Sequence, residues 1–472
     1  MLTRDQASAI FDKLRKYSSA DEVELLISSG RSALTRFANN AIHQNVAEES
    51  HTLSVRTSID VGSATGGRTA RASTNKLDDD SLRRLAQTAE TLGRTQQADP
   101  DLLPMPTPDE VAGAELDGDG IVQRHVERTS RIDARERADA VSRIVDVAKK
   151  NSLVSAGIYA TSEFSEGLFN SHGVAKWHEQ TSAEVSITMM GDTSSGWQKA
   201  NSPDAADLDP VKLAEVAAEK AVRSANPIEL PPGKYTVILE PSAVLDIVGF
   251  MLWDFSGSAL LEQRSFLNDR VGTKLFGDNI TVEDDVYHPL QTGAAFDGEG
   301  MTRQRLKLID KGVVRELAYS RGAATKMRHS ELAAKVGSVT PTGHGFMLPN
   351  EMGEAPLNIV FSGAEAGSAQ TVDQMIASTE RGILVTRLWY IREVDPYEKI
   401  LTGMTRDGTF LVEHSKVQSG VRNFRFNQSL IQMLRNVEAL GQAVRASGEE
   451  SIDMVVPPMT VREFNLTETT KF

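Results

Sequence analysis

The segment Phe296–Tyr319 combines two local patterns that leave the chain little freedom in how it folds. It opens with two carboxylates set between glycines, Asp297-Gly298-Glu299-Gly300, and glycine permits the sharp backbone bends of a tight turn. Apolar residues then flank Lys311-Gly312 on both sides, which is the pattern of a β-hairpin. We predict a turn that holds two carboxylates next to a hairpin. Loops of this kind often carry function, but these residues by themselves favour a solvated acidic loop.

The length of the chain, 472 residues, exceeds what one hydrophobic core normally organises, so at least two domains are expected. The run Pro231-Pro232-Gly233 interrupts the chain near its middle and marks the predicted boundary. We expect an N-terminal domain over residues 1–230, with two modules at about 1–95 and 110–230, and a C-terminal domain over residues 231–472. Helical and strand periodicities occur in both parts.

Hydrophobic periodicity and capping residues predict the main helices and strands. Acidic or hydroxyl side chains precede the predicted helices of the first domain, where they accept hydrogen bonds from free first-turn amides. The second domain is expected to open with a strand and an apolar helix that buries Phe250, and to consist mainly of strands after that. The predicted elements are helices after Thr3-Arg4-Asp5-Gln6, after Asp78, and over Asp133–Lys150, Asp209–Ala225, Ser242–Leu261 and Ser429–Val444, and strands at Val23–Ile27 and Tyr235–Leu239.

Composition excludes several classes of site and partner. The chain has no cysteine, which removes disulfides, thiolate metal sites and cysteine nucleophiles. Its net charge of −14 repels the phosphate backbone, so we expect no nucleic-acid partner. No apolar run approaches the roughly 18 residues that span a bilayer, and Met1-Leu2-Thr3-Arg4 leads into a polar helix without a signal-peptide pattern. We therefore expect no membrane association and a cytoplasmic location.

Histidines and acidic residues give weak signals elsewhere in the sequence. His344 lies in a glycine-rich turn, where we expect it to face water, and His178-Glu179 is expected to be an exposed pair. Asp284-Asp285 is predicted to be a solvated loop, because adjacent side chains on an extended chain point to opposite faces and do not form a metal pair. The run Gly62–Thr69 is similar to a phosphate-binding loop, but Arg68 replaces the lysine, so a plain turn is favoured.

Three stretches of the sequence resemble one protein family: Phe296–Tyr319, Gly382–Gly441 and Val23–Leu92. The motifs that carry the resemblance in the last two stretches are Thr402-Gly403, Thr405-Arg406-Asp407-Gly408, Asn423-Phe424-Arg425-Phe426-Asn427, Arg36-Phe37-Ala38-Asn39-Asn40 and a strand that ends at Gly62. They resemble the TldD/PmbA (TldE) family of metallopeptidase-related proteins, also known as modulators of DNA gyrase. The resemblance implies the α+β class, with an N-terminal α/β domain that has a sheet and flanking helices. It also implies a C-terminal domain with a curved, barrel-like, mainly antiparallel sheet and a few helices.

Catalytic members of this family carry an HExxxH motif on the helix that opens the second domain. There the two histidines hold zinc and the glutamate polarises the attacking water, and a cysteine near the C-terminus completes the site. This chain has none of the three: the matching helix reads PSAVLDIVGFMLWDFSG, and the histidine positions fall at about Gly249 and Asp254. No histidine occurs between His178 and His288. The resemblance therefore implies no catalytic residue, no metal ligand and no cofactor in this chain, with zinc in a partner subunit.

The family resemblance implies a TldE-like subunit that forms a heterodimer with a zinc-bearing TldD-type subunit, or a homodimer, in a complex that degrades or processes peptides. Two other functions stay open: a homo-oligomeric regulator of a toxin or of gyrase, and a peptidase with a noncanonical metal site. Carried over onto this sequence, the resemblance implies that a shared peptide cavity is lined by Asp297, Glu299, Tyr319, Arg392, Thr402, Arg406 and Asp407.

Overall fold

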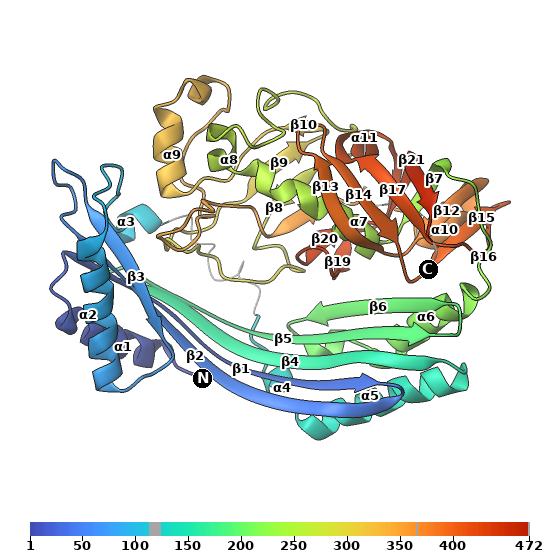
Figure 1. The fold of residues 1–472 in the computed structure, drawn as a ribbon, viewed down its shortest axis with the longest axis horizontal. Coiled ribbons are helices and arrows are strands. Elements are labelled where there is room, and N and C mark those ends of the chain that lie inside the picture. The colour runs from blue at the N-terminus through green and yellow to red at the C-terminus, as the bar shows by residue number, and fades with distance from the viewer. Residues whose placement is uncertain (113–123, 365–366, 471–472) are drawn as a thin grey trace.

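The structure is a computed structural model that describes residues 1–112, 124–364 and 367–470. A large curved sheet dominates the N-terminal half, and the C-terminal half lies over its concave face (Figure 1). The sheet is antiparallel throughout, in the order β3-β2-β1-β4-β5-β6. Its strands are β1 (Glu22–Ala38), β2 (Ala41–Ile59), β3 (Arg68–Thr74), β4 (Val154–Asn170), β5 (Ala175–Met190) and β6 (Ser195–Ser202).

Two pairs of helices pack against this sheet, α1 with α2 and α5 with α6, each pair over its own hydrophobic core. The side chains of Thr3, Asp78, Asp133 and Asp209 accept hydrogen bonds from first-turn amides, so the four predicted helix starts are confirmed. The helices of this half are α1 (Arg4–Tyr17), α2 (Asp79–Thr95), α3 (Pro108–Val111), α4 (Glu127–Ser130), α5 (Ala134–Lys150) and α6 (Pro210–Arg223).

Two further sheets form the C-terminal half, which curls into a half-barrel. The larger sheet runs β13-β14-β17-β21-β7-β12-β15-β16, with β18 paired to β21, and the smaller runs β10-β9-β8-β11-β20-β19. Most pairs are antiparallel, and β7 with β12 and β11 with β20 are parallel. The predicted α+β class and curved C-terminal sheet are confirmed.

The strands of the C-terminal half are short. Those of the larger sheet are β7 (Gly233–Leu239), β12 (Arg381–Val385), β13 (Leu388–Asp395), β14 (Ile400–Thr405), β15 (Thr409–Glu413), β16 (Lys416–Gly420), β17 (Phe424–Ser429), β18 (Val437–Leu440) and β21 (Met459–Thr469). Those of the smaller sheet are β8 (Val282–Asp284), β9 (Leu306–Asp310), β10 (Val313–Val314), β11 (Ile359–Phe361), β19 (Val444–Ala446) and β20 (Met454–Val456).

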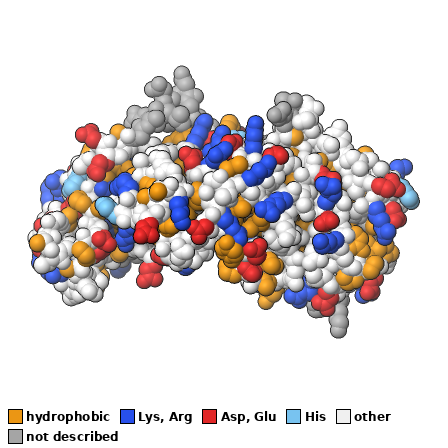
Figure 2. Space-filling view, turned by 90° about the horizontal axis from the view of Figure 1, so that it is seen from above, with side chains coloured by type: hydrophobic (Ala, Val, Ile, Leu, Met, Phe, Trp, Pro, Cys, Tyr) orange, Lys and Arg blue, Asp and Glu red, His pale blue; other side chains and the backbone are white. Residues whose placement is uncertain are grey.

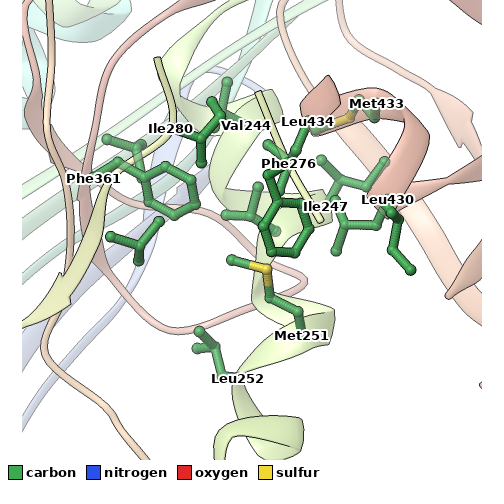
Figure 3. Packing of buried hydrophobic residues seen from close by; sticks show 14 of the residues in the cluster. Val244, Ile247, Met251, Leu252, Phe276, Ile280, Phe361, Leu430, Met433 and Leu434 are labelled. Atoms are coloured by element: carbon green, nitrogen blue, oxygen red, sulfur yellow. The ribbon is translucent and has the colours of Figure 1, made fainter. Parts of the chain in front are cut away.

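The predicted helix Ser242–Leu261 is broken into three pieces in the structure. It consists of α7 (Pro241–Val248), a 3₁₀ stretch η2 (Gly249–Phe255) and α8 (Gly257–Leu261), and the Ser256 side chain caps the last piece. The break places Phe250 at the margin of the core, where it is partly exposed, so the prediction that it is buried is wrong. The core side of α7 and η2 packs against residues from distant segments (Figure 3). Val244, Ile247, Met251 and Leu252 belong to α7 and η2, and the residues from elsewhere in the chain include Phe276, Ile280, Phe361, Leu430, Met433 and Leu434.

The predicted helix Ser429–Val444 is also shorter than expected. The helix observed there is α11 (Leu430–Arg435), and the strand that follows it, β18, pairs with β21. The hairpin of β9 and β10 is confirmed, since Lys311 and Gly312 form its turn with φ of 47° and 79°. The remaining helices are α9 (Arg321–Arg328) and α10 (Val372–Ser378). None of the helices within the described ranges combines the length and hydrophobicity needed to cross a bilayer.

Candidate functional site

A cavity of about 920 Å³ lies between the concave face of the N-terminal sheet and loops of the C-terminal half. We call it the central cavity. Strands β1, β2, β4, β5 and β6 contribute to its sheet side, and residues 291–298, 344–352 and 448–453 contribute most of its loop side. Its volume lies at the upper end of the range for ligand pockets. The cavity therefore has room for a ligand of several residues.

The carboxylates of the turn at 296–300 are buried beside the central cavity, so the solvated acidic loop favoured by the sequence is wrong. Asp297, which lines the cavity, accepts hydrogen bonds from the amides of Glu299 (2.9 Å), Met301 (2.9 Å) and Gly345 (2.7 Å). Gly298 allows the turn to lie against the loop at Met347, because a Cβ there would meet the Met347 nitrogen at 2.3 Å. Asp297 thus joins the turn to the facing loop.

Burial changes the acidity of both carboxylates in this turn. Burial raises the pKa of Asp297, although its three amide donors oppose the shift. Burial and the neighbouring Asp297 raise the pKa of Glu299 to about 7. Glu299 accepts a hydrogen bond from the Arg321 amide at 2.8 Å, at the start of α9. The turn therefore brings together two interacting carboxyl groups, one on the cavity wall and one behind it.

Tyr319 is buried one layer behind the cavity, on the C-terminal side of the hairpin. A Cβ on Gly257 would overlap its ring, so the close packing of α8 against Tyr319 requires glycine. Burial and the nearby Glu354 raise the pKa of Tyr319. Its hydroxyl has no hydrogen-bond partner within the part of the chain that the structure describes. Glu354 itself is held by Ser256, Ser258 and the Ser320 amide.

His344 and Asp284 form a buried pair, which overturns both sequence expectations of solvent exposure. The His344 ring contacts the Asp284 carboxylate through Nε2 at 3.0 Å and the Thr342 hydroxyl through Nδ1 at 3.0 Å. Burial by itself raises the pKa of Asp284, but His344 outweighs it and holds the pKa below its usual value. The two residues are 60 positions apart, and no local pattern in the sequence indicates this pairing.

The other sequence-predicted residues lie away from the central cavity. Arg406 and Asp407 line a second cleft of about 760 Å³ between the β5–β6 turn and the C-terminal sheet. Asp407 is buried there, with ion-pair and hydrogen-bond contacts to Arg387 (2.9 Å) and Ser195 (2.7 Å). Arg392 is exposed on β13 and faces Thr402 across the strand pair. The structure thus divides the seven residues among three places.

The family's zinc ligands do not fit at the matching helix. A side chain at Gly249 would meet the Ser451 hydroxyl oxygen at 1.9 Å. Asp254 forms a buried ion pair with Lys399 at 2.6 Å and accepts a hydrogen bond from the Phe266 amide at 3.0 Å. Within the described ranges, no group of three or more histidine, cysteine, aspartate or glutamate side chains is placed to hold a metal. The segment at 241–261 is here part of the packed core.

Sequence reasoning missed the polar groups on the sheet side of the cavity. Glu166 on β4 and Glu184 on β5 both line it, and Glu184 pairs with Lys199 at 3.4 Å. In the sequence these residues belong to ordinary alternating strands. No local signal in the sequence indicated that the C-terminal half would cover the face on which they lie.

Known protein families match the chain along most of its length. It matches the PmbA/TldA metallopeptidase domain 1 over residues 23–92, the central domain over residues 123–225 and the C-terminal domain over residues 232–468. These matches, with the fold, define a metallopeptidase-like protein. The chain belongs to the PmbA/TldD family.

Two solved structures are similar to the chain over nearly their whole length. TldE from Thermococcus kodakarensis is 17% identical, with a TM-score of 0.83 over 98% of this chain and 99% of that one. A Thermotoga maritima protein named as a modulator of a DNA gyrase is 17% identical, with a TM-score of 0.80 over 97% of this chain and 98% of that one. At this identity the similarity establishes the fold.

Among curated proteins, a metalloprotease from Methanothermobacter thermautotrophicus is 21% identical over 349 residues, which are 69% of this chain and 71% of that protein. An uncharacterised protein from Methanocaldococcus jannaschii is 27% identical over 179 residues, which are 37% of this chain and 42% of that protein. The second match therefore spans less than half of that relative.

Proposed function

We propose that this chain is a TldE-like, zinc-free subunit of a cytoplasmic peptide-processing complex whose second subunit is a zinc-bearing TldD-type protein. The family is metallopeptidase-like, and named relatives are metalloproteases. In such a complex the partner supplies zinc and the attacking water, and this chain supplies walls and contacts for the peptide.

The observation that carries this proposal is the chemistry of the helix at 241–261. The two positions that correspond to zinc-binding histidines are Gly249 and Asp254. The first is packed against Ser451 and the second is neutralised by Lys399. A lysine ammonium 2.6 Å from the only acidic group at these two positions disfavours a cation there. These contacts support a subunit that does not hold the catalytic metal.

The N-terminal sheet offers a place where an extended peptide can bind. Strand β2 pairs with β3 through residues 53–59, so residues 41–52 of β2 have no strand on their outer side among the described residues. That stretch is almost entirely solvent exposed. Free edge strands bind extended peptides through backbone hydrogen bonds. The edge supports a role in holding unfolded substrate through its backbone.

The first test is the metal content of the purified chain, measured by mass spectrometry after dialysis against trace zinc. We expect less than about a tenth of an equivalent, because a protein zinc site needs several ligand side chains and no group of three or more is placed to hold a metal among the described residues. The chain is then mixed with a TldD-type subunit that carries HExxxH, and complex formation and peptide cleavage are measured. We expect a heterodimer that cleaves peptide, with no cleavage by this chain alone.

Other outcomes of these measurements would contradict the proposal. A full equivalent of zinc together with cleavage by the isolated chain would mean that it is an independent peptidase. A stable homodimer that neither binds the TldD-type subunit nor changes its cleavage rate would favour a regulatory role.

A further inference from the structure

Glu166 occupies a distinctive position on the sheet side of the central cavity. It lies on β4, opposite Ser28 of β1 and His178 of β5 in the strand register. Its side chain therefore shares the concave face with these two residues, and it lines the cavity. The opposite face of β4 carries Glu163, which lines a separate pocket next to α5 and contacts His125 at 2.7 Å.

The Glu166 carboxylate has no hydrogen bond and no ion pair within the described ranges. The other acidic groups on the cavity wall are already paired. Asp297 accepts three amide hydrogen bonds, Glu184 pairs with Lys199, and Asp453 pairs with Arg445 at 3.3 Å. Burial raises the pKa of Glu166, and the attraction of Arg303 opposes this only in part. A partly buried, unpaired carboxylate gains most from a cation supplied by a ligand.

The wall around Glu166 is mainly apolar. Met347 and Met352 are 51% and 55% exposed, which is high for large hydrophobic side chains. Methionine adapts its shape to different apolar partners, so it suits a surface that accepts varied side chains. Arg303 is held by the Asn358 amide oxygen and does not pair with Glu166. The apolar side chains on the cavity wall are Leu26, Ile27, Phe296, Phe346, Met347, Met352, Leu357 and Ile452.

The face of the molecule seen from above carries both kinds of surface (Figure 2). Lysine and arginine side chains gather over its middle, and exposed hydrophobic side chains lie beside them. A basic outer surface does not by itself attract cations. The lysine and arginine side chains of this outer region favour anions. The Glu166 carboxylate on the sheet side of the central cavity favours a cation instead.

We propose that the central cavity binds peptides through an ammonium group placed on Glu166, with adjacent apolar side chains against Met347 and Met352. The inference rests on the proposed function, since it names the peptides that such a subunit would select. Either a lysine side chain or a free amino terminus supplies the ammonium, and both have the same chemistry. One unpaired carboxylate among the described residues of a mainly apolar wall matches a ligand with one cation next to hydrophobic groups.

The test uses the full chain and three hexapeptides of leucine and alanine, each amidated at its C-terminus. The first is acetylated and contains one lysine, the second has a free amino terminus and no lysine, and the third is acetylated and has norleucine in place of lysine. Binding is measured by calorimetry at low and moderate salt for the native chain, for Glu166→Gln and for the matched control Glu163→Gln. Thermal unfolding of each variant establishes that it folds.

We expect at least one cationic peptide to bind about tenfold more tightly than the neutral peptide. Glu166→Gln should remove this difference, and Glu163→Gln should preserve it. The cationic peptide that binds the native chain more tightly than the neutral peptide does identifies the source of the ammonium. This source is a lysine side chain for the first peptide and a free amino terminus for the second. Equal binding of all three peptides to the native chain, or an unchanged preference in Glu166→Gln, would overturn the inference.

These results are separable from the test of the proposed function. If cationic peptides bind through Glu166 but no TldD-type subunit assembles with the chain, the inference stands for a different peptide-binding protein. If the complex assembles and cleaves peptide but Glu166→Gln leaves cleavage of lysine-containing and neutral peptides in the same ratio, the inference is wrong and the proposed function stands. Met347→Ala with Met352→Ala should weaken all three peptides alike, because these side chains contribute apolar contact and no charge.

Discussion

The strands of the N-terminal sheet pair in long, regular ladders, whereas those of the C-terminal half are short and joined across large sequence distances. Strand β1 stays paired with β2 along Glu22–Ala38, with one register shift. In the C-terminal half, β7 pairs with both β12 and β21, which come more than a hundred residues later in the chain. In the N-terminal sheet, the strand register determines which side chains are neighbours. In the C-terminal half, contacts between segments far apart in the sequence determine it.

One buried carboxylate from each half illustrates this difference. Glu24, Arg56 and Arg71 are opposite one another in three adjacent strands, so register alone assembles their buried ion cluster. Asp246 in α7 accepts hydrogen bonds from the Leu388 and Glu450 amides, and no basic group lies within ion-pair distance of it among the described residues. Register therefore supplies the countercharges of Glu24, while tertiary contacts supply Asp246 with amides.

Removing an apolar anchor from the C-terminal core should have the largest effect. Phe255→Ala is expected to lower the free energy of unfolding by about 3–5 kcal/mol, because Phe255 is fully buried where distant segments meet. Phe250→Ala, five residues earlier and partly exposed, should cost less than half as much. Urea denaturation of both variants measures the difference. Equal losses of unfolding free energy in the two variants would mean that the Phe250 side chain is covered in solution, for example by a partner subunit.

Breaking the buried ion cluster of Glu24, Arg56 and Arg71 should have the next largest effect on stability. Glu24→Gln leaves two buried guanidinium groups without their carboxylate and should lower the free energy of unfolding by about 3 kcal/mol at pH 7. Burial by itself raises the pKa of Glu24, but Arg56 and Arg71 outweigh it and hold the pKa below its usual value. The stability from Glu24 is therefore present at neutral pH and lost as the pH falls below about 4.5.

A matched control separates this cluster from the general effect of removing an acidic group. Glu49→Gln, at an exposed position of β2, should change the free energy of unfolding by less than about 0.5 kcal/mol. Chemical denaturation of both variants at pH 7 and pH 3.5 supplies the comparison. A Glu24→Gln loss that does not shrink at the lower pH would contradict the charge-based explanation.

The carboxylate of Asp246 should show the opposite dependence on pH. Burial raises its pKa to about 7. Since this folded-state value exceeds the unfolded one, the contribution of Asp246 is fully present below about pH 4 and is lost as the pH rises to about 7. Asp246→Asn should flatten the pH dependence of unfolding over this window by roughly 4 kcal/mol. Identical pH profiles for the variant and the native chain would contradict the pKa shift.

The smallest effect is expected when histidines are introduced at positions 249 and 254, where the family resemblance places the zinc ligands. Gly249→His with Asp254→His should not create a zinc site or peptide cleavage. The first side chain collides with Ser451, and the second removes one of the two carboxylates that pair with buried Lys399. Mass spectrometry for zinc and a peptide-cleavage assay test this, with Asp254→Asn as the control for the loss of the ion pair. Stoichiometric zinc in the double variant would show that the helix can adapt.

The sequence predicted the helices of the N-terminal half well because their starts carry local signals. Thr3, Asp78, Asp133 and Asp209 each bond to amides within three residues, so nothing distant is needed to recognise them. The hairpin turn at Lys311-Gly312 was recognised for the same reason. The apolar run at 242–261 failed as a single helix, since periodicity does not report where Gly249 meets Ser451 from the other end of the chain.

The candidate site was only partly visible in the sequence. The turn at 296–300 was noticed from its glycines and carboxylates, but its burial depends on Gly345 and Arg321, which the chain brings in from elsewhere. Glu166 carried no signal because it is one polar residue in an alternating strand. Its significance comes from the apolar loops that cover it.

The sequence by itself determined the family, the α+β class, the helix starts, the tight turns and the absence of an HExxxH motif and of cysteine, because each depends on residue identity or on contacts a few residues apart. The tertiary structure decided which carboxylates are buried, which have partners and which face the cavity. Those properties depend on the distance between groups far apart in the chain and on how much water the fold excludes around them. Neither quantity is encoded at a single position.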